Sequence, residues 1–148
     1  MALPPAMNFK IRTAAPADVN AMHGLRNRVR ENRLSSTTGI SEASYQRYIA
    51  AGSAWVAEGA DGIAGFAAID APAMTVWALF VDPKAEGAGI GSALHNKMLE
   101  WARDQGIGRL SLSTSQGSRA VQFYNRAGWT QIGVTADGEV RFERALLG

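Results

Sequence analysis

The chain has 148 residues, which is enough to bury one hydrophobic core and short for two ordinary domains, so a single domain over residues 1–148 is predicted. The absence of cysteine excludes disulfides, thiolate metal sites and a cysteine nucleophile, and favours a cytoplasmic location. A formal net charge of +2 without a basic stripe, and the lack of an apolar run of about 20 residues, argue against nucleic-acid and membrane partners.

Turn residues and hydrophobic periodicity divide the chain into elements. Short alternating runs indicate strands, and apolar residues at three- and four-residue spacing indicate helices. After a flexible extension at residues 1–7, the predicted elements are a strand at 9–13, a helix from 16 to about 33, a helix at 44–50 capped by Ser41, strands at 54–58, 63–69 and 75–81, a helix at 89–105, a strand at 109–113, a helix at 118–126, and strands at 130–134 and 139–144. This order predicts a mixed α+β domain with about four helices.

A glycine-rich turn joins the strand that ends at Val81 to the helix that begins at Gly89. Gly87, Gly89 and Gly91 let the backbone approach a ligand closely, and the first N–H groups of a helix lack partners within the helix. Because the positive end of the helix dipole lies behind them, the turn predicts an anion site whose usual ligand is phosphate. A plain strand-to-helix turn is the alternative.

The residues around the turn narrow the choice of phosphate ligand. A nucleotide-hydrolysing loop ends in Gly-Lys-Ser or Gly-Lys-Thr, which is absent here. A dinucleotide-binding fingerprint needs glycine where this chain has Ser92, and it normally opens an alternating parallel fold. A dinucleotide-binding domain therefore stays only as a rival interpretation.

The turn resembles motif A of the GNAT superfamily of acetyltransferases. The matching residues are Val81, Pro83, Gly89, Ile90 and Gly91. Glu86 departs from the motif, because it stands where the family commonly has Arg or Gln. A carboxylate beside a diphosphate is repulsive unless it turns away or meets a cation such as Lys84, so somewhat weaker cofactor affinity is expected.

A second segment, from Ser118 to Trp129, resembles motif B of the same family. The matching residues are Ala120, Phe123, Tyr124, Gly128 and Trp129. The resemblance implies that Tyr124 is the general acid for the departing thiolate, since a phenol can donate a proton or a hydrogen bond to sulfur. Gly117 stands where the family commonly has an asparagine that contacts pantetheine. The residues that could substitute for that asparagine are Ser115, Gln116 and Ser118.

The resemblance implies a fold, a cofactor and a set of binding residues. The fold is a mostly antiparallel, twisted sheet that splays between its fourth and fifth strands, and the cofactor is acetyl-CoA, with no metal. Pantetheine would bond to the backbone of the fourth strand, where the N–H of Phe80 would polarise the thioester carbonyl. The implied cofactor-binding residues are Leu79, Phe80, Val81, Glu86, Gly87, Ala88, Gly89, Ile90, Gly91, Ser92 and Tyr124. A homodimer is also a family-level expectation.

The implied reaction is direct attack of an amine on acetyl-CoA in a ternary complex, and it needs a group that helps the amine lose a proton. Residues 74–78, on the strand where many relatives carry a glutamate, contain no carboxylate. Glu31 is the first candidate base and Asp70 the second, although the residue type favours an ordinary surface acid at both positions. Aminoglycosides, polyamines, amino acids and protein amino termini all stay open as acceptors. A non-catalytic acyl-CoA-binding module or sensor is the alternative function.

Overall fold

The computed structural model describes residues 9–31 and 42–146, without the side chains of Arg30 and Glu31. The predicted extension at residues 1–7 and the predicted cap at Ser41 lie outside the described residues. The strands are β1 (Lys10–Thr13), β2 (Ala54–Gly59), β3 (Gly62–Asp70), β4 (Thr75–Val81), β5 (Arg109–Ser115), β6 (Thr130–Val134) and β7 (Glu139–Ala145). The helices are α1 (Val19–Glu31), α2 (Glu42–Ala50), α3 (Ile90–Asp104) and α4 (Arg119–Arg126), with one-turn 3-10 helices η2 (Pro16–Asp18) and η3 (Pro83–Ala85).

The strands pair as a seven-stranded mixed sheet in the order β1-β2-β3-β4-β5-β7-β6. The pairs β1–β2, β2–β3, β5–β7 and β6–β7 are antiparallel, whereas β4 and β5 are parallel and pair at Thr75 and Ser111. The N–H of Ser111 donates to the carbonyl of Met74 at 3.0 Å. The predicted mixed α+β fold class is therefore confirmed, while the splay predicted further along β4 and β5 stays a prediction.

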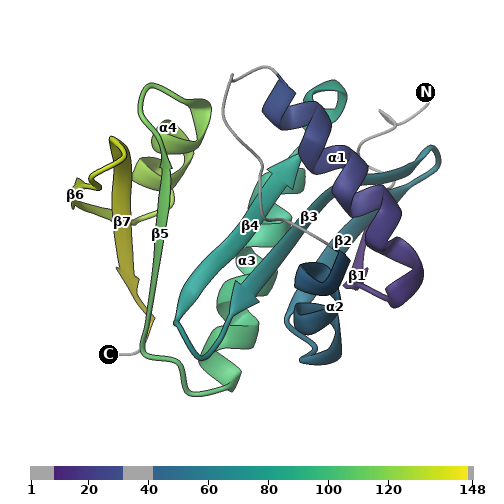
Figure 1. Cartoon of the computed structure of the whole chain (residues 1–148), viewed down its shortest axis with the longest axis horizontal. Helices are drawn as coiled ribbons and strands as arrows, with labels where there is room; N and C mark the ends of the chain where they lie inside the picture. The colour runs from purple at the N-terminus through teal and green to yellow at the C-terminus, as the bar shows by residue number, and fades with distance from the viewer. Residues whose placement is uncertain (1–8, 32–41, 147–148) are drawn as a thin grey trace. The chain divides into compact units, whose positions relative to one another are not determined.

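The chain forms two compact units, of which the first comprises residues 1–69 and 78–98. In this unit α1 and α2 lie in front of the strands in Figure 1, and α3 lies behind them. The apolar faces predicted for α1 and α3 are confirmed, because Met22, Leu25, Leu94 and Met98 are fully buried. These side chains place the core of the first unit on both faces of its strands.

A close contact between α3 and β3 depends on Gly65. A Cβ atom at this position would lie 3.0 Å from Cγ2 of Ile90, 3.0 Å from the carbonyl oxygen of Phe80 and 3.1 Å from Cδ1 of Leu94. Real Cβ atoms are rarely that close to their neighbours, so glycine allows the first turn of α3 to approach β3 and the end of β4. Gly65 thereby helps to position the start of α3.

An ion pair at the start of α1 connects β1 to η2. The guanidinium of Arg12 donates from Nη1 to Oδ2 of Asp18 at 2.7 Å and from Nη2 to Oδ1 at 2.9 Å, and its Nε donates to Oε1 of Glu58 at 3.0 Å. The N–H of Ala15 also donates to Oδ2 of Asp18 at 2.7 Å. The Arg12 hydrogen bonds are the main cause that lowers the pKa of the Asp18 carboxyl.

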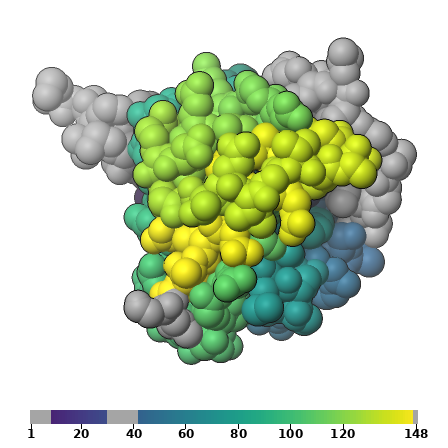
Figure 2. Space-filling model, turned by 90° about the vertical axis from the view of Figure 1, so that its left-hand side faces the viewer, coloured from purple at the N-terminus to yellow at the C-terminus, as the bar shows by residue number. Residues whose placement is uncertain are grey.

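The second unit comprises residues 70–77 and 99–148 and contains α4 and the strands β5, β7 and β6. The hairpin predicted at residues 137–138 is confirmed, and Gly138 occupies the left-handed region with φ 83°. All of β6 is exposed, including Ile132 and Val134. Figure 2 shows the surface of the C-terminal elements in green and yellow. None of the helices among the described residues is long and apolar enough to span a membrane.

Candidate active site

Asp82 anchors the turn that follows β4. Its N–H donates to the carbonyl of Ala64 at 2.8 Å, and its Oδ1 accepts from the N–H of Lys84 at 3.0 Å. Its Oδ2 accepts from Nη2 of Arg28 on α1 at 3.2 Å. Because α1, β3 and η3 all bond to this one residue, the turn leaves β4 in a defined direction.

Two glycines of the turn have a left-handed backbone conformation. Gly87 and Gly89 have φ angles of 83° and 85°, in the left-handed region that residues with a side chain rarely adopt. A Cβ at either position would meet no atom within 4 Å. The conformation of the backbone, and not a lack of space, therefore explains why glycine is needed at these two positions.

The turn ends at the amino terminus of α3. The N–H of Ala93 donates to the carbonyl of Gly89 at 3.0 Å, which is the first bond of the helical type. The N–H groups of Ile90, Gly91 and Ser92 precede that bond, so they have no acceptor four residues earlier within the helix. Together with the helix dipole, they form a set of donors suited to an anion.

Glu86 lies on the exposed side of the turn. Its own N–H donates to the carbonyl of Pro83 at 3.4 Å, so this predicted donor is used within η3. The side chain of Lys84 makes no ion pair with any residue in the described part of the chain, and Lys84 is therefore not the cation that neutralises Glu86 here. Glu86 remains the predicted cause of weaker affinity for a diphosphate.

Phe80 is the best-defined of the predicted pantetheine-binding residues on β4. Leu79, Phe80 and Val81 are half-buried at the end of this strand, next to the turn. The ring of Phe80 packs on that of Phe66 with centroids 5.5 Å apart, and the guanidinium carbon of Arg26 lies 5.0 Å from its centroid. Packing from β3 and α1 thus restrains the residue whose N–H is the predicted oxyanion donor.

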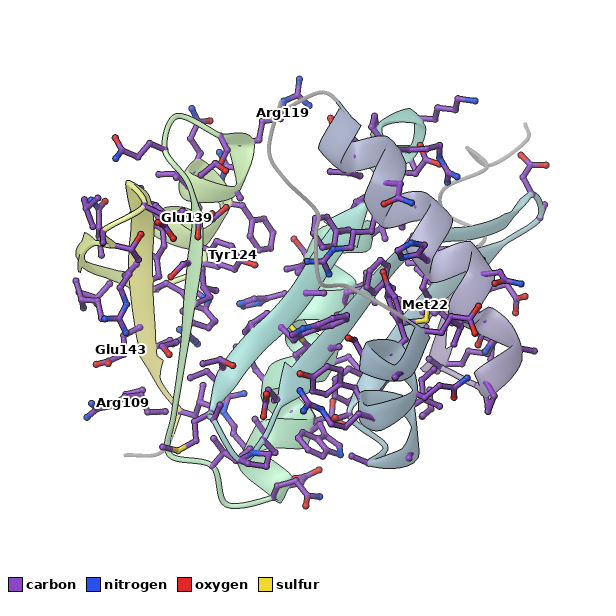
Figure 3. All side chains as sticks on the ribbon, viewed as in Figure 1. Met22, Arg109, Arg119, Tyr124, Glu139 and Glu143 are labelled. Atoms are coloured by element: carbon purple, nitrogen blue, oxygen red, sulfur yellow. The ribbon has the colours of Figure 1, made fainter. Side chains whose placement is uncertain are left out.

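Tyr124 belongs to the second unit, where α4 carries it (Figure 3). Its ring lies 5.3 Å from that of Phe123, 5.4 Å from that of Trp129 and 5.8 Å from that of Phe142, and the residue is 5% exposed. Burial raises the pKa of the phenol above its ordinary value, so the hydroxyl keeps its proton at neutral pH. Within the described residues this hydroxyl makes no hydrogen bond. The hydroxyl oxygen is not fully enclosed, because the fully buried side-chain polar atoms without a partner in the described part of the chain belong to Arg26 and Arg144.

The loop before α4 contains the departure from the family pattern at Gly117. Gly117 has φ 70°, and asparagine is the residue that best replaces glycine in this left-handed region. Ser118 donates from its hydroxyl to the carbonyl of Ser115 at 2.7 Å, and Gln116 donates from its amide to the carbonyl of Gly138 at 2.6 Å. Two of the three predicted substitutes therefore already hold the loop itself.

Of the two predicted bases, Glu31 and Asp70, the structure describes the side chain of Asp70 alone. Glu31 ends α1 in the first unit, and its side chain lies outside the described residues. Asp70 belongs to the second unit, where its Oδ1 accepts from the N–H of Ala73 at 3.2 Å in the turn between β3 and β4. Among residues 9–31 and 42–146, no cluster of three or more His, Asp or Glu side chains is placed to hold a metal ion.

The sequence patterns did not reveal a polar contact in the first unit between His23 and Tyr45. Nδ1 of His23 on α1 lies 2.9 Å from the hydroxyl of Tyr45 on α2, and the two rings meet edge to face. The two residues are 22 positions apart, so no local motif connects them. Only the placement of His23 on the helical face next to Met22 could have suggested that it points inward.

The glycine turn follows a central strand of a mixed seven-stranded sheet. Residues 28–140 match the family described as an acetyltransferase (GNAT) domain. This match covers well over half of the chain, which therefore belongs to the GNAT acetyltransferase family.

Two curated relatives match part of the chain. A mycothiol acetyltransferase from Beutenbergia cavernae is 35% identical over 68 residues, which are 45% of this chain and 23% of the relative. A streptothricin acetyltransferase from Streptomyces lavendulae is 37% identical over 86 residues, 54% of this chain and 46% of the relative. The matches thus span less than half the length of these two relatives.

Solved structures share the fold along nearly the whole chain. An N-acetyltransferase from Staphylococcus aureus superposes with a TM-score of 0.81 at 21% identity, covering 94% of this chain and 99% of that one. The PaiA N-acetyltransferase from Thermoplasma acidophilum, in complex with coenzyme A, superposes with a TM-score of 0.76 at 17% identity and the same coverage. At these identities the likeness establishes the fold alone.

Proposed function

We propose that the chain is an N-acetyltransferase that moves the acetyl group of acetyl-CoA to a primary amine within a ternary complex. The observation that carries this proposal is the left-handed turn at Gly87 and Gly89, which leaves the first N–H groups of α3 free to bind a diphosphate. The coenzyme A bound to the PaiA relative and the acetyltransferase names of the two curated relatives support the same cofactor. The amine itself is unspecified.

In the proposed reaction the amine nitrogen forms a bond to the acetyl carbon while the carbon–sulfur bond breaks. The N–H of Phe80 would donate to the carbonyl oxygen as negative charge develops there. The amine attacks in its neutral form, so its nitrogen loses one further proton after the bond forms, and the departing thiolate gains one proton from the solvent or from a donor. A thiol has an ordinary pKa of about 8.5, well below that of the buried Tyr124, so Tyr124 would act mainly by donating a hydrogen bond to sulfur.

A screen of amines tests the proposal directly. Release of coenzyme A from acetyl-CoA would be followed with a thiol reagent in the presence of aminoglycosides, polyamines, amino acids and peptides with free amino termini. We expect at least one class to raise the rate above hydrolysis. Binding of acetyl-CoA without turnover of any amine would favour the alternative, a non-catalytic acyl-CoA-binding module.

Thermal unfolding distinguishes an acetyltransferase or an acyl-CoA-binding module from a dinucleotide-binding domain. A ligand at a hundred times its dissociation constant adds about 2.7 kcal/mol to the free energy of unfolding. Acetyl-CoA should therefore raise the melting temperature and NAD should not. Light scattering on the same preparation would give the oligomeric state. The prediction for this state is a homodimer.

A further inference from the structure

Arg26 is a buried cation on α1 that contacts the strand where the acyl group is proposed to bind. The residue is 5% exposed, and its guanidinium carbon lies 5.0 Å from the centroid of the Phe80 ring. Arg26 and Phe80 both belong to the first unit, so this contact lies within one compact body. It brings a positive charge next to the residue whose N–H is the proposed oxyanion donor.

Two nitrogens of this guanidinium, Nε and Nη1, are fully buried and have no hydrogen-bond acceptor in the described part of the chain. Arg26 is not without partners, since its guanidinium lies over the Phe80 ring. An aromatic face attracts the charge, but it does not replace oxygen acceptors for the individual N–H groups. Burial of a charged group is costly unless its donors are bonded. These two donors therefore indicate an acceptor that a ligand supplies.

Two carboxylates beside α1 are already bonded to other arginines. Asp18, directly before α1, accepts two hydrogen bonds from Arg12, and Asp82 accepts one from Arg28 at 3.2 Å. These pairs show how a guanidinium is satisfied in the first unit. Nε and Nη1 of Arg26 lack an acceptor of this kind among the described residues.

The position of Arg26 favours the acceptor substrate over the cofactor as the source of the anion. In acetyl-CoA the pantetheine arm separates the thioester from the diphosphate, and the diphosphate is proposed to bind at the start of α3. Phe80 is the proposed partner of the thioester carbonyl, so the cofactor would present no charged group beside it. The amine that attacks this carbonyl must approach the same place. Arginine suits a carboxylate there, because its planar guanidinium donates several N–H bonds to oxygen.

We propose that Arg26 binds a carboxylate of the acceptor, so that the preferred substrates are amines that carry a carboxylate, as amino acids do. The carboxylate would accept hydrogen bonds from the guanidinium and hold the amine nitrogen near the acetyl carbon. Both nitrogens are covered by the chain itself, so the half-buried Phe80 ring would have to rotate to admit the ligand. Arg26 determines specificity in this scheme and takes no part in proton transfer. The inference rests on the proposed acetyltransferase function.

Pairs of amines that differ only in the carboxylate test this assignment. The most active amino acid of the screen, β-alanine and 4-aminobutyrate would each be compared with the corresponding primary amide. We expect kcat/KM of the parent to be about tenfold or more higher for at least one acid than for its amide. In Arg26→Met this preference should fall to about twofold or less. Comparing the acid-to-amide ratio between parent and variant cancels the difference in amine pKa between an acid and its amide.

The same ratio distinguishes substrate recognition from a structural role of Arg26. A structural role would lower the rates with acid and amide alike and leave the ratio unchanged. Lys10→Met, which removes one positive charge from an exposed position on β1, should keep the ratio of the parent. Arg26→Lys retains the charge without the planar fork, so it should keep part of the preference. If Arg26→Met does not fold, the parent and Arg26→Lys still give the comparison.

Three results would contradict the assignment. A parent that acetylates acids and amides equally, or only amines without a carboxylate, overturns it and leaves the acetyltransferase proposal intact. The same holds if folded Arg26→Met keeps the acid-to-amide ratio of the parent. An unchanged ratio together with weaker binding of acetyl-CoA, measured by calorimetry, would assign the guanidinium to a cofactor phosphate instead. A parent that binds acetyl-CoA and acetylates no amine overturns both proposals.

Discussion

The guanidinium carbon of Arg26 lies 5.0 Å from the centre of the Phe80 ring, so a buried cation on α1 covers the residue proposed to bind the acyl group. A cation over an aromatic face is worth about 0.5–2 kcal/mol, with the larger values at sites shielded from water. We expect a double-mutant cycle of Arg26→Met and Phe80→Leu to give a coupling energy in this range in urea unfolding. Arg126→Met, a change at an exposed position of the second unit, should show no coupling to Phe80→Leu. Additive effects of the first pair would contradict an energetic role for this contact.

Gly65→Ala should weaken both folding and cofactor binding although Gly65 is not among the residues expected to touch the cofactor. The added methyl group would crowd Ile90, Leu94 and the carbonyl of Phe80, so α3 must shift or its side chains must leave their preferred rotamers. We expect a loss of about 1–3 kcal/mol in the free energy of unfolding. Displacement of the start of α3 should also reduce acetyl-CoA affinity, measured by calorimetry.

Gly59→Ala is the matched control for that experiment. Gly59 ends β2, and a Cβ there would lie 3.9 Å from Cβ of Phe9, an ordinary contact. Stability and affinity should both stay close to the parent values. If Gly65→Ala bound acetyl-CoA as tightly as Gly59→Ala, the approach of α3 to β3 would have no part in cofactor binding.

Tyr124→Phe should separate turnover from stability. The hydroxyl has no hydrogen bond to a described residue, so its removal costs no internal bond and should leave the melting temperature unchanged or slightly higher. The rate of acetyl transfer should fall at least tenfold, while acetyl-CoA affinity changes little. Steady-state kinetics, calorimetry and thermal unfolding of the same sample measure the three quantities.

Tyr48→Phe provides the control for loss of a buried tyrosine hydroxyl. Tyr48 lies on α2 and accepts a hydrogen bond from Arg47, away from the proposed chemistry. Its replacement should lower stability and leave turnover unchanged. Undiminished turnover in Tyr124→Phe would remove Tyr124 from the mechanism.

The ion pair between Arg12 and Asp18 should make stability depend on acidic pH. The pKa of Asp18 is lowered in the folded state, so its contribution is present above the ordinary carboxyl value of about 3.9 and is lost as the pH falls through the folded value. We expect Asp18→Asn to lower the free energy of unfolding by about 1–3 kcal/mol at pH 7. The difference from the parent should shrink steadily below pH 4.

Asp61→Asn, in the exposed turn between β2 and β3, serves as the reference variant for this titration. Denaturant unfolding at several pH values between 2 and 7 would give the two difference curves. A difference between parent and Asp18→Asn that stays constant over this range would show that the ionised carboxyl contributes nothing.

Much of the fold could be predicted because the signals are local. The turn at Asp137 and Gly138, the helix that starts after Gly89 and the strand that ends at Val81 each depend on a few neighbouring residues, and all three are confirmed. The turn at Gly87 and Gly89 could be predicted for the same reason. Closely spaced glycines directly before an amphipathic helix are a strong local signal of a turn.

The remaining features depend on residues that are distant in sequence. The pairs Arg28–Asp82 and His23–Tyr45 join positions 54 and 22 residues apart, and no spacing rule connects them. Gly65 resembles an ordinary small residue within a strand, and only the placement of α3 explains it. Sequence patterns therefore identified the proposed cofactor turn but not the side of α1 that faces β4.

The space around Gly87 and Gly89 is open, so a larger side chain would fit at either position. What excludes an ordinary residue there is the left-handed backbone conformation. A mirror-image residue, such as D-alanine placed there by chemical ligation, prefers the very backbone angles that an L-residue avoids. Such a substitution would stiffen the unbound loop while leaving its amide groups uncovered. The backbone angles at these two positions therefore restrict the chirality of the residue that can occupy them.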